Sequence, residues 1–396
     1  MRTVWITRSF LDYRIPVYRE LSMLLGMELV VVYNADVVPD RVRVKVIEAL
    51  GSKAIGLKGE WQLGRKTYTN HAANSGIRLP WQPGLLPEVR RHKPEVLITD
   101  GFFQWTAAAL WLRITERIPH VLCYERTADT ERNAQWYRRF YRRWALRYVD
   151  AMCCNGRLCG EYARQIGMPA ERITYGQMAA DTNGLCSGLG RVTDQHRADL
   201  RRRFSLRGTC LLYVGRLTIE KGLRQLLAAW IELDLDVRAA ASLLLVGDGR
   251  DRTYLESFCK TNNCPEVHFA GPIDYDQLPA FYAVADAFVI PTLEDNWSLV
   301  VPEAMACGLP VLCSKYNGCW PELVRDELNG WVFDPVDPQD TVRCLERCLR
   351  QAHRLPSMGS ASEGLVRNYT PRRAAESIIE ACRIAVASRQ SRDTRT

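Results

Sequence analysis

Two carboxylates, Asp295 and Glu303, flank seven residues that form a polar turn followed by the start of an apolar run. Ser298 is the expected N-cap of a helix that begins here. A helix start directs free backbone N–H groups toward anions. Carboxylates beside it can accept hydrogen bonds from sugar hydroxyls. The segment therefore predicts a site for a nucleotide-sugar.

Two cations follow another apolar run, the expected strand 211–214. Gly215 lets the backbone turn, and Arg216 and Lys221 come directly after it. Open parallel sheets bind ligands at the carboxyl ends of their strands. A planar guanidinium and a compact ammonium together can neutralise a diphosphate. The alternative is a surface turn that carries two solvated charges.

Glycine turns end two further expected strands, at Val246–Gly249 and at Phe269–Ile273. Backbone groups near Pro272 and Ile273 would meet the edge of a nucleobase. In a parallel sheet, all these strand-end turns converge on one edge, where they would form a single site. Plain strand-end turns, and a capped surface helix with two solvated acids, are the alternatives.

Short apolar runs alternate with longer amphipathic segments in both halves of the chain, which indicates parallel sheets with crossover helices. The expected strands are 4–7, 29–33, 96–99, 121–124 and 151–154, then 211–214, 243–246, 267–270, 287–290 and 311–313. The fold class predicted is α/β, with two successive doubly wound domains. Residues 36–87 have no clear pattern.

The 396 residues are 47% hydrophobic and 25% charged, as in ordinary globular proteins of two domains. No run approaches the ~20 apolar residues of a membrane span. We therefore expect a cytoplasmic protein, at most peripheral on the cytoplasmic face of a membrane. The 14 cysteines lie mainly in apolar segments, which predicts buried thiols rather than disulfides. No ligand spacing for a metal accompanies them.

Residues 131–147 hold six arginines and one glutamate, interleaved with aromatic side chains, in a chain of net charge +8. One interpretation is a helix that packs its aromatic residues inward and exposes its arginines. The other is a surface, Arg132–Arg147, for anionic lipid headgroups or a polyprenyl-phosphate acceptor. No nucleic acid is expected as a partner, since no module that reads it is present.

Five motifs then occur in a fixed order. They are Val214-Gly-Arg-Leu-x3-Lys-Gly222, Val246-Gly-Asp-Gly249, Phe269-x-Gly271, Ala285–Pro291, and Asp295-x7-Glu303 continued by Ala304–Val311. The ordered set resembles retaining glycosyltransferase family 4, the glycosyl transferases group 1, over roughly 211–333. The resemblance implies the GT-B fold, with two Rossmann-like domains facing a central cleft and a C-terminal helix crossing back to the first domain. We expect an acceptor-binding domain at 1–180, a nucleotide-sugar-binding domain at 205–370, and a helix and tail at 371–396.

The resemblance also implies roles for single residues. Arg216 and Lys221 would hold the donor diphosphate, Glu303 the ribose, and Asp295 the donor sugar as a catalytic residue. The remaining donor contacts are Glu294, Asn296, Trp297, Ser298 and Leu299 for the sugar and phosphates, and Pro272 and Ile273 for the base. No metal and no cofactor besides the nucleotide-sugar co-substrate is implied.

The sequence departs from the family pattern at three places. Asp295 stands where glutamate is usual, so either it or Glu294 would contact the donor sugar. Pro302 replaces an aliphatic residue and is tolerable only in the first turn of a helix. Residues 12–16, Asp-Tyr-Arg-Ile-Pro, replace a glycine pair in the first loop.

Polar residues at strand ends of the first half would form the acceptor side. They are Tyr13 and Arg14, Asp100 and Gly101, and Glu125 and Arg126. Glu125 stands near a place where the family often has histidine, and we assign Glu125 and Arg126 to the catalytic cleft. The alternative is a set of salt bridges among buried strand ends.

The resemblance implies a metal-independent, hexosyltransferase-like enzyme. It would move a sugar from a nucleoside-diphosphate-sugar, such as a UDP-sugar, to an acceptor hydroxyl with retention. The acceptor would be a sugar, a lipid-linked molecule or another small molecule, in glycan, glycolipid or cell-surface polysaccharide biosynthesis. A nucleotide-sugar epimerase of the same fold, and a non-catalytic binder of anionic lipid or nucleic acid, are the alternatives.

Overall fold

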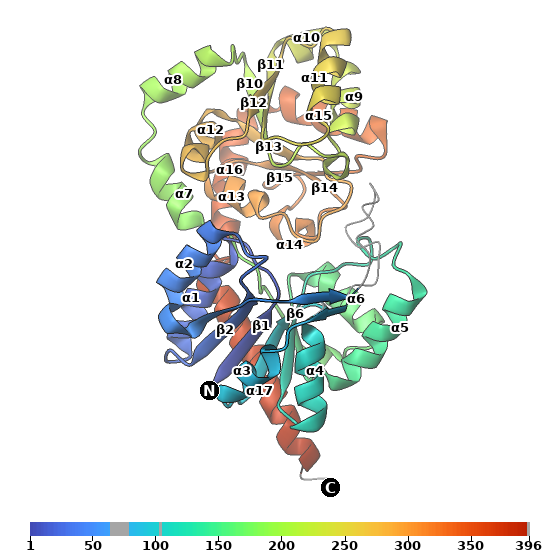
Figure 1. The fold of residues 1–396 in the computed structure, drawn as a ribbon. Helices are drawn as coiled ribbons and strands as arrows, with labels where there is room; N and C mark the ends of the chain where they lie inside the picture. The colour runs from blue at the N-terminus through green and yellow to red at the C-terminus, as the bar shows by residue number, and fades with distance from the viewer. Residues whose placement is uncertain (64–78, 103–104, 394–396) are drawn as a thin grey trace.

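The computed structural model describes residues 1–63, 79–102 and 105–393, and it contains two parallel β-sheets stacked along the long axis of the molecule (Figure 1). The first is a seven-stranded sheet of order β3-β2-β1-β6-β7-β8-β9. Its strands are β1 (Thr3–Thr7), β2 (Leu29–Asn34), β3 (Ala54–Leu57), β6 (Val96–Asp100), β7 (His120–Tyr124), β8 (Ala151–Cys154) and β9 (Ile173–Tyr175). A small antiparallel pair, β4 (Trp61–Leu63) and β5 (Leu79–Trp81), lies outside it.

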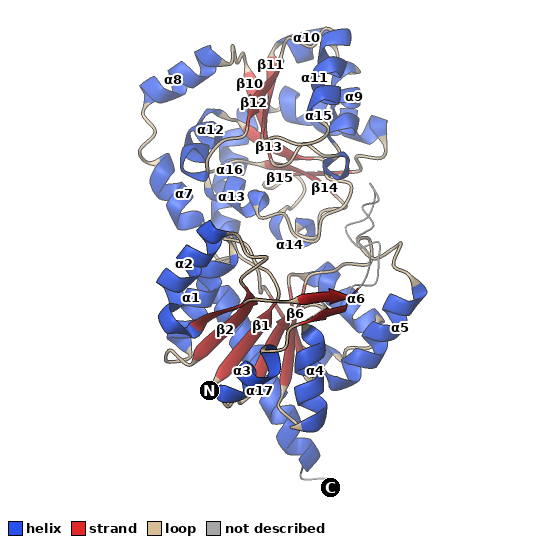
Figure 2. Ribbon diagram, viewed as in Figure 1, coloured by secondary structure: helices blue, strands red, loops and turns tan. Residues whose placement is uncertain are grey.

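Helices cover both faces of this first sheet (Figure 2). They are α1 (Arg14–Leu24), α2 (Asp40–Leu50), α3 (Leu85–Arg91), α4 (Thr106–Thr115), α5 (Trp136–Ala145) and α6 (Arg157–Gln165). Alternate strand residues point to opposite faces. Trp5 and Val31 accordingly join the hydrophobic cluster of α1 and α2, and Val4 and Val32 join the cluster of α3 and α4.

The second sheet has six parallel strands in the order β12-β11-β10-β13-β14-β15. They are β10 (Thr209–Val214), β11 (Ala241–Val246), β12 (Val267–Gly271), β13 (Ala287–Ile290), β14 (Val311–Ser314) and β15 (Gly330–Phe333). Its helices are α9 (Leu223–Ile231), α10 (Leu235–Ala239), α11 (Arg252–Thr261), α12 (Leu278–Val284), α13 (Val300–Ala306), α14 (Trp320–Leu323), α15 (Pro338–Arg350) and α16 (Leu355–Val366). Two helices, α7 (Thr182–Leu189) and α8 (Asp194–Arg203), lead from the first sheet to the second.

All ten expected strands are present, and all but β12, an edge strand whose middle residues are partly buried, are apolar runs buried on both faces of a sheet. Three strands of the large sheets were not predicted from the sequence: β3, β9 and β15. They are short edge strands, and β3 is only partly buried, so the apolar signal is weak. Residues 36–87, which had no clear pattern, contain α2 and β3 as well.

The last helix, α17 (Pro371–Asp393), returns to the N-terminal domain (Figure 1). It packs against α1 and against β7, β8 and β9. Arg372 forms an ion pair with Glu20 at 3.6 Å, and the Thr174 hydroxyl donates to the Ser377 carbonyl at 2.9 Å. The predicted return of the C-terminal helix is confirmed.

The two domains face each other across polar contacts. Arg132 pairs with Glu294 at 3.4 Å, and the Arg157 N–H donates to the Glu322 carboxylate. Beside this contact lies a pocket of about 430 Å³ whose lining includes Asn155 from one domain and Glu322 from the other. The structure thus has two Rossmann-like domains in the arrangement that the sequence predicted.

The cysteines are all free thiols, and Cys186 is the exposed one among them. The prediction of buried thiols is therefore confirmed, and burial in an apolar core raises the pKa of the Cys123 thiol. Among the helices that the structure describes, none has the length and apolar character needed to cross a membrane.

Candidate active site

The loops at the carboxyl edge of the second sheet interlock through their main chains. The Leu217 N–H, after β10, donates to the Asp248 carbonyl, after β11, at 2.9 Å. The Leu293 N–H, after β13, donates to the Glu220 carbonyl at 2.9 Å. These contacts bring the strand-end turns of β10, β11 and β13 together, as the sequence predicted.

Glycine is required where these loops touch. Gly222 has φ +69°, and a Cβ atom there would lie 1.9 Å from the Pro291 carbonyl oxygen. Gly247 has φ +132°, and its Cβ would lie 1.9 Å from the Gly215 carbonyl oxygen. The Gly247 N–H also donates to the Gly271 carbonyl at 2.8 Å, which adds the turn after β12 to the cluster. Any side chain at Gly222 or Gly247 would force these loops apart.

Lys221 and Asp295 meet at the centre of this cluster. The Lys221 ammonium contacts Asp295 Oδ2 at 2.5 Å, and both side chains are mostly buried. The Ser298 hydroxyl donates to the same oxygen at 2.6 Å, and the Trp297 N–H donates to Oδ1 at 3.1 Å. Asp295 therefore holds Lys221 against the turn that precedes α13.

The expectation that Ser298 caps the helix is wrong. The helix α13 begins at Val300, and its N-cap position, Leu299, makes no side-chain cap. The Ser298 hydroxyl is instead occupied by Asp295, because that carboxylate turns back over the loop. Pro302 lies in the first turn, where its missing N–H costs nothing.

Some backbone donors at this helix start remain available to a ligand. The Trp297 N–H is used by Asp295, and the Ser298 N–H points at Asn317 Oδ1, 3.4 Å away. The N–H groups of Asn296 and Leu299 donate to no acceptor within the described part of the chain. Two of the four predicted donors thus have no acceptor among the described residues. Buried Asn317, which orders the loop, was missed because an asparagine after a strand carries no distinctive signal.

Glu294 points away from this cluster. Its carboxylate is 40% exposed and pairs with Arg132 of the other domain. Asp295, by contrast, lies beside Lys221. Of the two acids, Asp295 therefore belongs to the cluster around Lys221 and Glu294 to the contact between the domains.

Arg216 lies on the exposed side of the same loop. Its carbonyl accepts a hydrogen bond from the Tyr213 hydroxyl at 2.8 Å, which fixes the main chain. Its guanidinium forms no ion pair with any residue that the structure describes. Arg216 lies five residues before Lys221, in the same segment between β10 and α9.

Glu303 is buried in α13, and the Tyr282 hydroxyl donates to its Oε2 at 3.2 Å. Burial raises the pKa of Glu303 to about 7, although hydrogen bonds from Tyr282 and Tyr275 act in the opposite direction. Tyr275 belongs to the loop that contains Pro272 and Ile273, of which Pro272 is exposed. The residues assigned to ribose and base therefore lie in neighbouring segments.

Replacing Glu303 by glutamine is expected to weaken donor binding and to stabilise the folded protein at pH 8. The stability from protonated Glu303 is full below its unfolded pKa and is lost as pH rises through about 7. The neutral amide avoids that loss, worth roughly 2–3 kcal/mol. Thermal unfolding of the variant and the native protein at pH 5 and pH 8 measures this difference in stability. Glu256→Gln, at an exposed position of the same domain, is the control. Equal melting temperatures of the Glu303→Gln variant and the native protein at pH 8 would contradict the raised pKa of Glu303.

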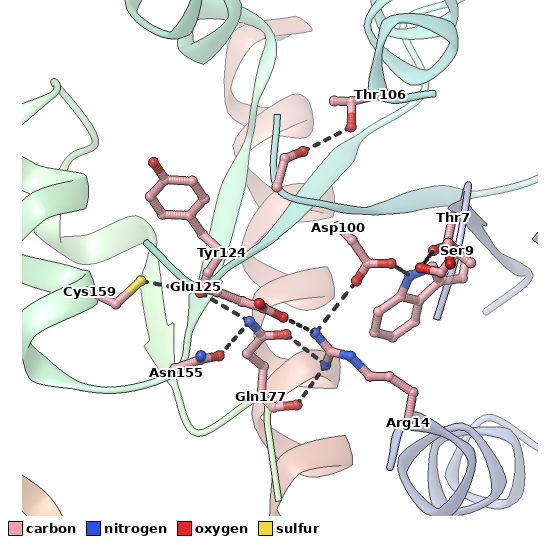
Figure 3. A network of polar contacts seen from close by, with 12 residues as sticks. Thr7, Ser9, Arg14, Asp100, Thr106, Tyr124, Glu125, Asn155, Cys159 and Gln177 are labelled. Atoms are coloured by element: carbon pink, nitrogen blue, oxygen red, sulfur yellow. Dashed lines mark hydrogen bonds and ion pairs between the residues drawn. The ribbon is translucent and has the colours of Figure 1, made fainter. Parts of the chain in front are cut away.

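Three of the predicted acceptor-side residues, Arg14, Asp100 and Glu125, form one polar network (Figure 3). Buried Arg14 donates to Glu125 Oε1 at 2.8 Å and to Gln177 Oε1 at 2.9 Å. It also pairs with Asp100 at 3.6 Å, and the Trp5 indole N–H donates to Asp100 at 3.1 Å. The network joins the carboxyl ends of β1, β6 and β7 to the linker after β9.

Burial in this network raises the pKa of Glu125, and it raises the pKa of Tyr13 to about 12. Tyr13 also packs against the core cluster of the C-terminal domain. Gln177 was not predicted, although it is the link between Arg14 and Asn155, whose Oδ1 accepts from Gln177 Nε2 at 2.7 Å. A single polar residue beside an apolar run was the only signal for it.

Arg126 and Gly101 lie apart from the ion pairs of this network. Arg126 turns toward Glu131, 3.6 Å away, rather than toward Glu125. Gly101 has φ +56°, and its N–H donates to the Cys123 carbonyl at 2.7 Å, so it shapes the turn after β6. The predicted salt bridging among strand ends is therefore present around Arg14.

No group of three or more histidine, cysteine, aspartate or glutamate side chains able to hold a metal ion occurs in residues 1–63, 79–102 and 105–393.

Comparison with known protein families gives two matches that together span most of the chain. Residues 200–363 match the model described as glycosyl transferases group 1. Residues 26–175 match the glycosyl transferase 4-like domain. The two segments correspond to the two sheets.

Curated relatives match over part of their length. An uncharacterised glycosyltransferase of Methanocaldococcus jannaschii is 37% identical over 141 residues, 35% of each chain. A D-inositol 3-phosphate glycosyltransferase of Salinispora tropica is 30% identical over 234 residues, 56% of this chain and 48% of the relative. The chain thus spans between about a third and a half of these relatives.

Solved structures match over nearly the whole chain. Anabaena Alr3699/HepE in complex with UDP has a TM-score of 0.74 at 16% identity, covering 97% of this chain and all of that one. Sucrose-phosphate synthase from Thermosynechococcus elongatus has a TM-score of 0.69 at 17% identity, covering 98% and 100%. The likeness to these structures shows the GT-B fold. The two family matches, which together span most of the chain, show that it belongs to the group 1 glycosyltransferases.

Proposed function

We propose that this protein transfers a sugar, with retention, from a nucleoside-diphosphate-sugar to an acceptor hydroxyl. The observation that carries the proposal is the Lys221–Asp295 pair at the carboxyl edge of the second sheet, with free Arg216 on the same loop. This is the edge at which doubly wound sheets bind nucleotides. A UDP-sugar is the first donor to test, since HepE has been solved with UDP and with UDP-glucose.

The diphosphate of the donor gains negative charge as the glycosidic bond breaks. Arg216 and Lys221 would face this charge together with the free N–H groups of Asn296 and Leu299. Fixed donors in a partly buried site stabilise developing charge without having to reorganise. The ammonium of Lys221 has three N–H donors, so it can keep Asp295 and still bind a phosphate oxygen.

Asp295 would accept a hydrogen bond from a hydroxyl of the donor sugar, and it orients Lys221. Retention follows if the acceptor attacks from the face that the diphosphate leaves. The bond from the acceptor oxygen to the anomeric carbon forms, and the bond from that carbon to the phosphate oxygen breaks. The acceptor proton passes to the leaving phosphate oxygen. No covalent intermediate with the protein is needed.

The polar network around Arg14 would form the wall of the site that faces the donor residues of the second domain. The Glu125 side chain remains 26% exposed while Arg14 holds one of its oxygens, so it can accept a further hydrogen bond from a sugar hydroxyl. Because Arg14, Asp100 and Gln177 are tied to four strand ends, Glu125 is held in a fixed orientation. This rigidity suits a group that positions an acceptor.

We further infer a metal-independent reaction in the cytoplasm, within glycan, glycolipid or cell-surface polysaccharide biosynthesis. Arg216 and Lys221 supply the positive charge that a divalent cation would otherwise bring to the diphosphate. The fourteen free thiols suit a reducing compartment. A lipopolysaccharide 1,2-N-acetylglucosaminetransferase among the relatives, 28% identical over 194 residues, is consistent with such a pathway.

A thermal-shift screen of UDP-, GDP- and ADP-sugars tests the proposal, because a donor that binds the folded state raises the melting temperature. We expect one nucleotide class to stabilise the native protein but not Lys221→Ala. Product NMR then reports the anomeric configuration. An inverted product would contradict retention, an isomerised donor formed without acceptor would indicate an epimerase, and no stabilisation by any nucleotide-sugar would refute a donor site.

A further inference from the structure

Helix α5 turns its largest aromatic side chains outward, at the outer edge of the N-terminal domain (Figure 1). Trp136 is 79% exposed, Phe140 is 70% exposed and Trp144 is 38% exposed. The interpretation with aromatic residues packed inward is therefore wrong for these three, whereas Tyr141 of the same helix does pack against the core of the domain. Arg142 and Ala145 are the buried residues of the helix, and Arg142 pairs with the carboxylate of buried Glu131.

Exposed arginines run beside this aromatic row. Successive helical residues are about 100° apart, so positions four residues apart form a row. Trp136, Phe140 and Trp144 make one such row, and Arg139 and Arg143 make the adjacent one. Neither row contains an acid, and Arg143 has no ion-pair partner in the described part of the chain.

We propose that this face of α5 docks on an anionic lipid bilayer. Its three aromatic side chains would enter the interfacial region, where large rings with polar edges are favoured. Arg139 and Arg143, with exposed Arg147 in the turn after the helix, would contact lipid phosphates. Aromatic insertion and charge attraction then act on the same short helix.

The dimensions of the face favour a bilayer over a protein partner. Ten residues of helix extend about 15 Å, and a helix is about 10 Å wide. That area is far below the ~800 Å² that each partner buries in a stable protein interface. A bilayer needs no complementary shape, so three protruding rings and a cationic edge are sufficient for weak, reversible docking.

The helix is also connected to the acceptor side of the candidate site. Glu131, the partner of Arg142, lies 3.6 Å from Arg126, which directly follows Glu125. Docking would therefore place the Glu125 loop close to the membrane surface, where a lipid-linked acceptor would be presented. This consequence depends on the proposed function, whereas the docking itself does not.

Sedimentation with vesicles tests the proposal on the full-length protein. Vesicles of phosphatidylcholine containing about one third phosphatidylglycerol should bind it, and pure phosphatidylcholine vesicles should bind far less. Replacing Arg139, Arg143 and Arg147 by glutamine should lower binding to the anionic vesicles roughly a hundredfold. The matched control removes three exposed arginines from α8, Arg197→Gln, Arg202→Gln and Arg203→Gln, and should bind nearly as well as the native protein.

A second variant, Trp136→Ser with Phe140→Ser and Trp144→Ser, separates insertion from simple charge attraction. It should lose most binding that survives at high salt, while circular dichroism and donor-induced stabilisation stay unchanged. Equal losses in the α8 control would overturn the proposal, because net charge would then explain the binding. The proposal would also be overturned if the native protein did not bind vesicles but formed dimers or bound RNA, and the serine variant lost that dimerisation or RNA binding.

Discussion

Replacing Lys221 by alanine is expected to lower kcat/KM for the nucleotide-sugar donor by roughly 10²- to 10³-fold, the usual cost of removing a donor that stabilises developing charge. The effect is large because the Asp295 carboxylate then faces the diphosphate without its partner, so that a repulsion replaces an attraction. The measurement is initial-rate kinetics with the donor identified by thermal shift.

Lys315→Ala is the matched control for this variant. Lys315 pairs with Asp334 at 2.6 Å in the same domain, and neither residue forms an ion pair with Lys221 or Asp295. The control should change kcat/KM by less than about twofold, as for surface ion pairs. Asp295→Asn combined with Lys221→Ala should cost less than the two single losses together, since the residues act as a pair. Unchanged turnover in Lys221→Ala would refute the site.

Replacing Arg14 by alanine is expected to destabilise the N-terminal domain by about 3–5 kcal/mol, the cost of removing one partner from a buried ion pair. Asp100 and Glu125 would be left close together without the cation that both contact. The Gln177 carbonyl and side-chain oxygens would lose their donor as well. Chemical unfolding of the full-length protein, followed by circular dichroism, measures the loss.

Arg91→Ala provides the comparison. Arg91 is 74% exposed and pairs with Glu88 at 3.1 Å, so its loss should cost at most about 1 kcal/mol. Arg14→Lys keeps the charge but lacks the planar fork, and an intermediate loss is expected. An alanine variant at position 14 as stable as the Arg91 variant would show that the network contributes little to folding.

Sequence alone predicted the strands and the meeting of their glycine turns, for a local physical reason. A buried parallel strand must be an apolar run, and the chain then has to turn at its carboxyl end. Gly222 and Gly247 lie where another main chain passes within contact distance, which is why glycine marks the site so clearly. Lys221 and Asp295 could be placed together from that pattern.

The orientation of side chains could not be predicted in the same way. Segment 131–147 has arginine and aromatic residues on every side, so its composition does not say which face is buried. The buried face is decided by Glu131, which draws Arg142 inward. Ser298 is a similar case. Its hydroxyl could either cap the helix or donate to the Asp295 carboxylate, and in the structure it donates to Asp295.

The return of α17 has a consequence for how this chain is made. Its buried residues, among them Ile378 and Cys382, complete the same hydrophobic cluster as Trp5 and Val31. The N-terminal domain therefore lacks part of its core until α17 is synthesised, and the entire second domain is made before that core is complete. Until then the sheet face that α17 covers is open to other chains. The packing of α17 onto the first sheet joins segments that are far apart in the sequence. The entropic cost of bringing them together grows only slowly with the length of the chain between them.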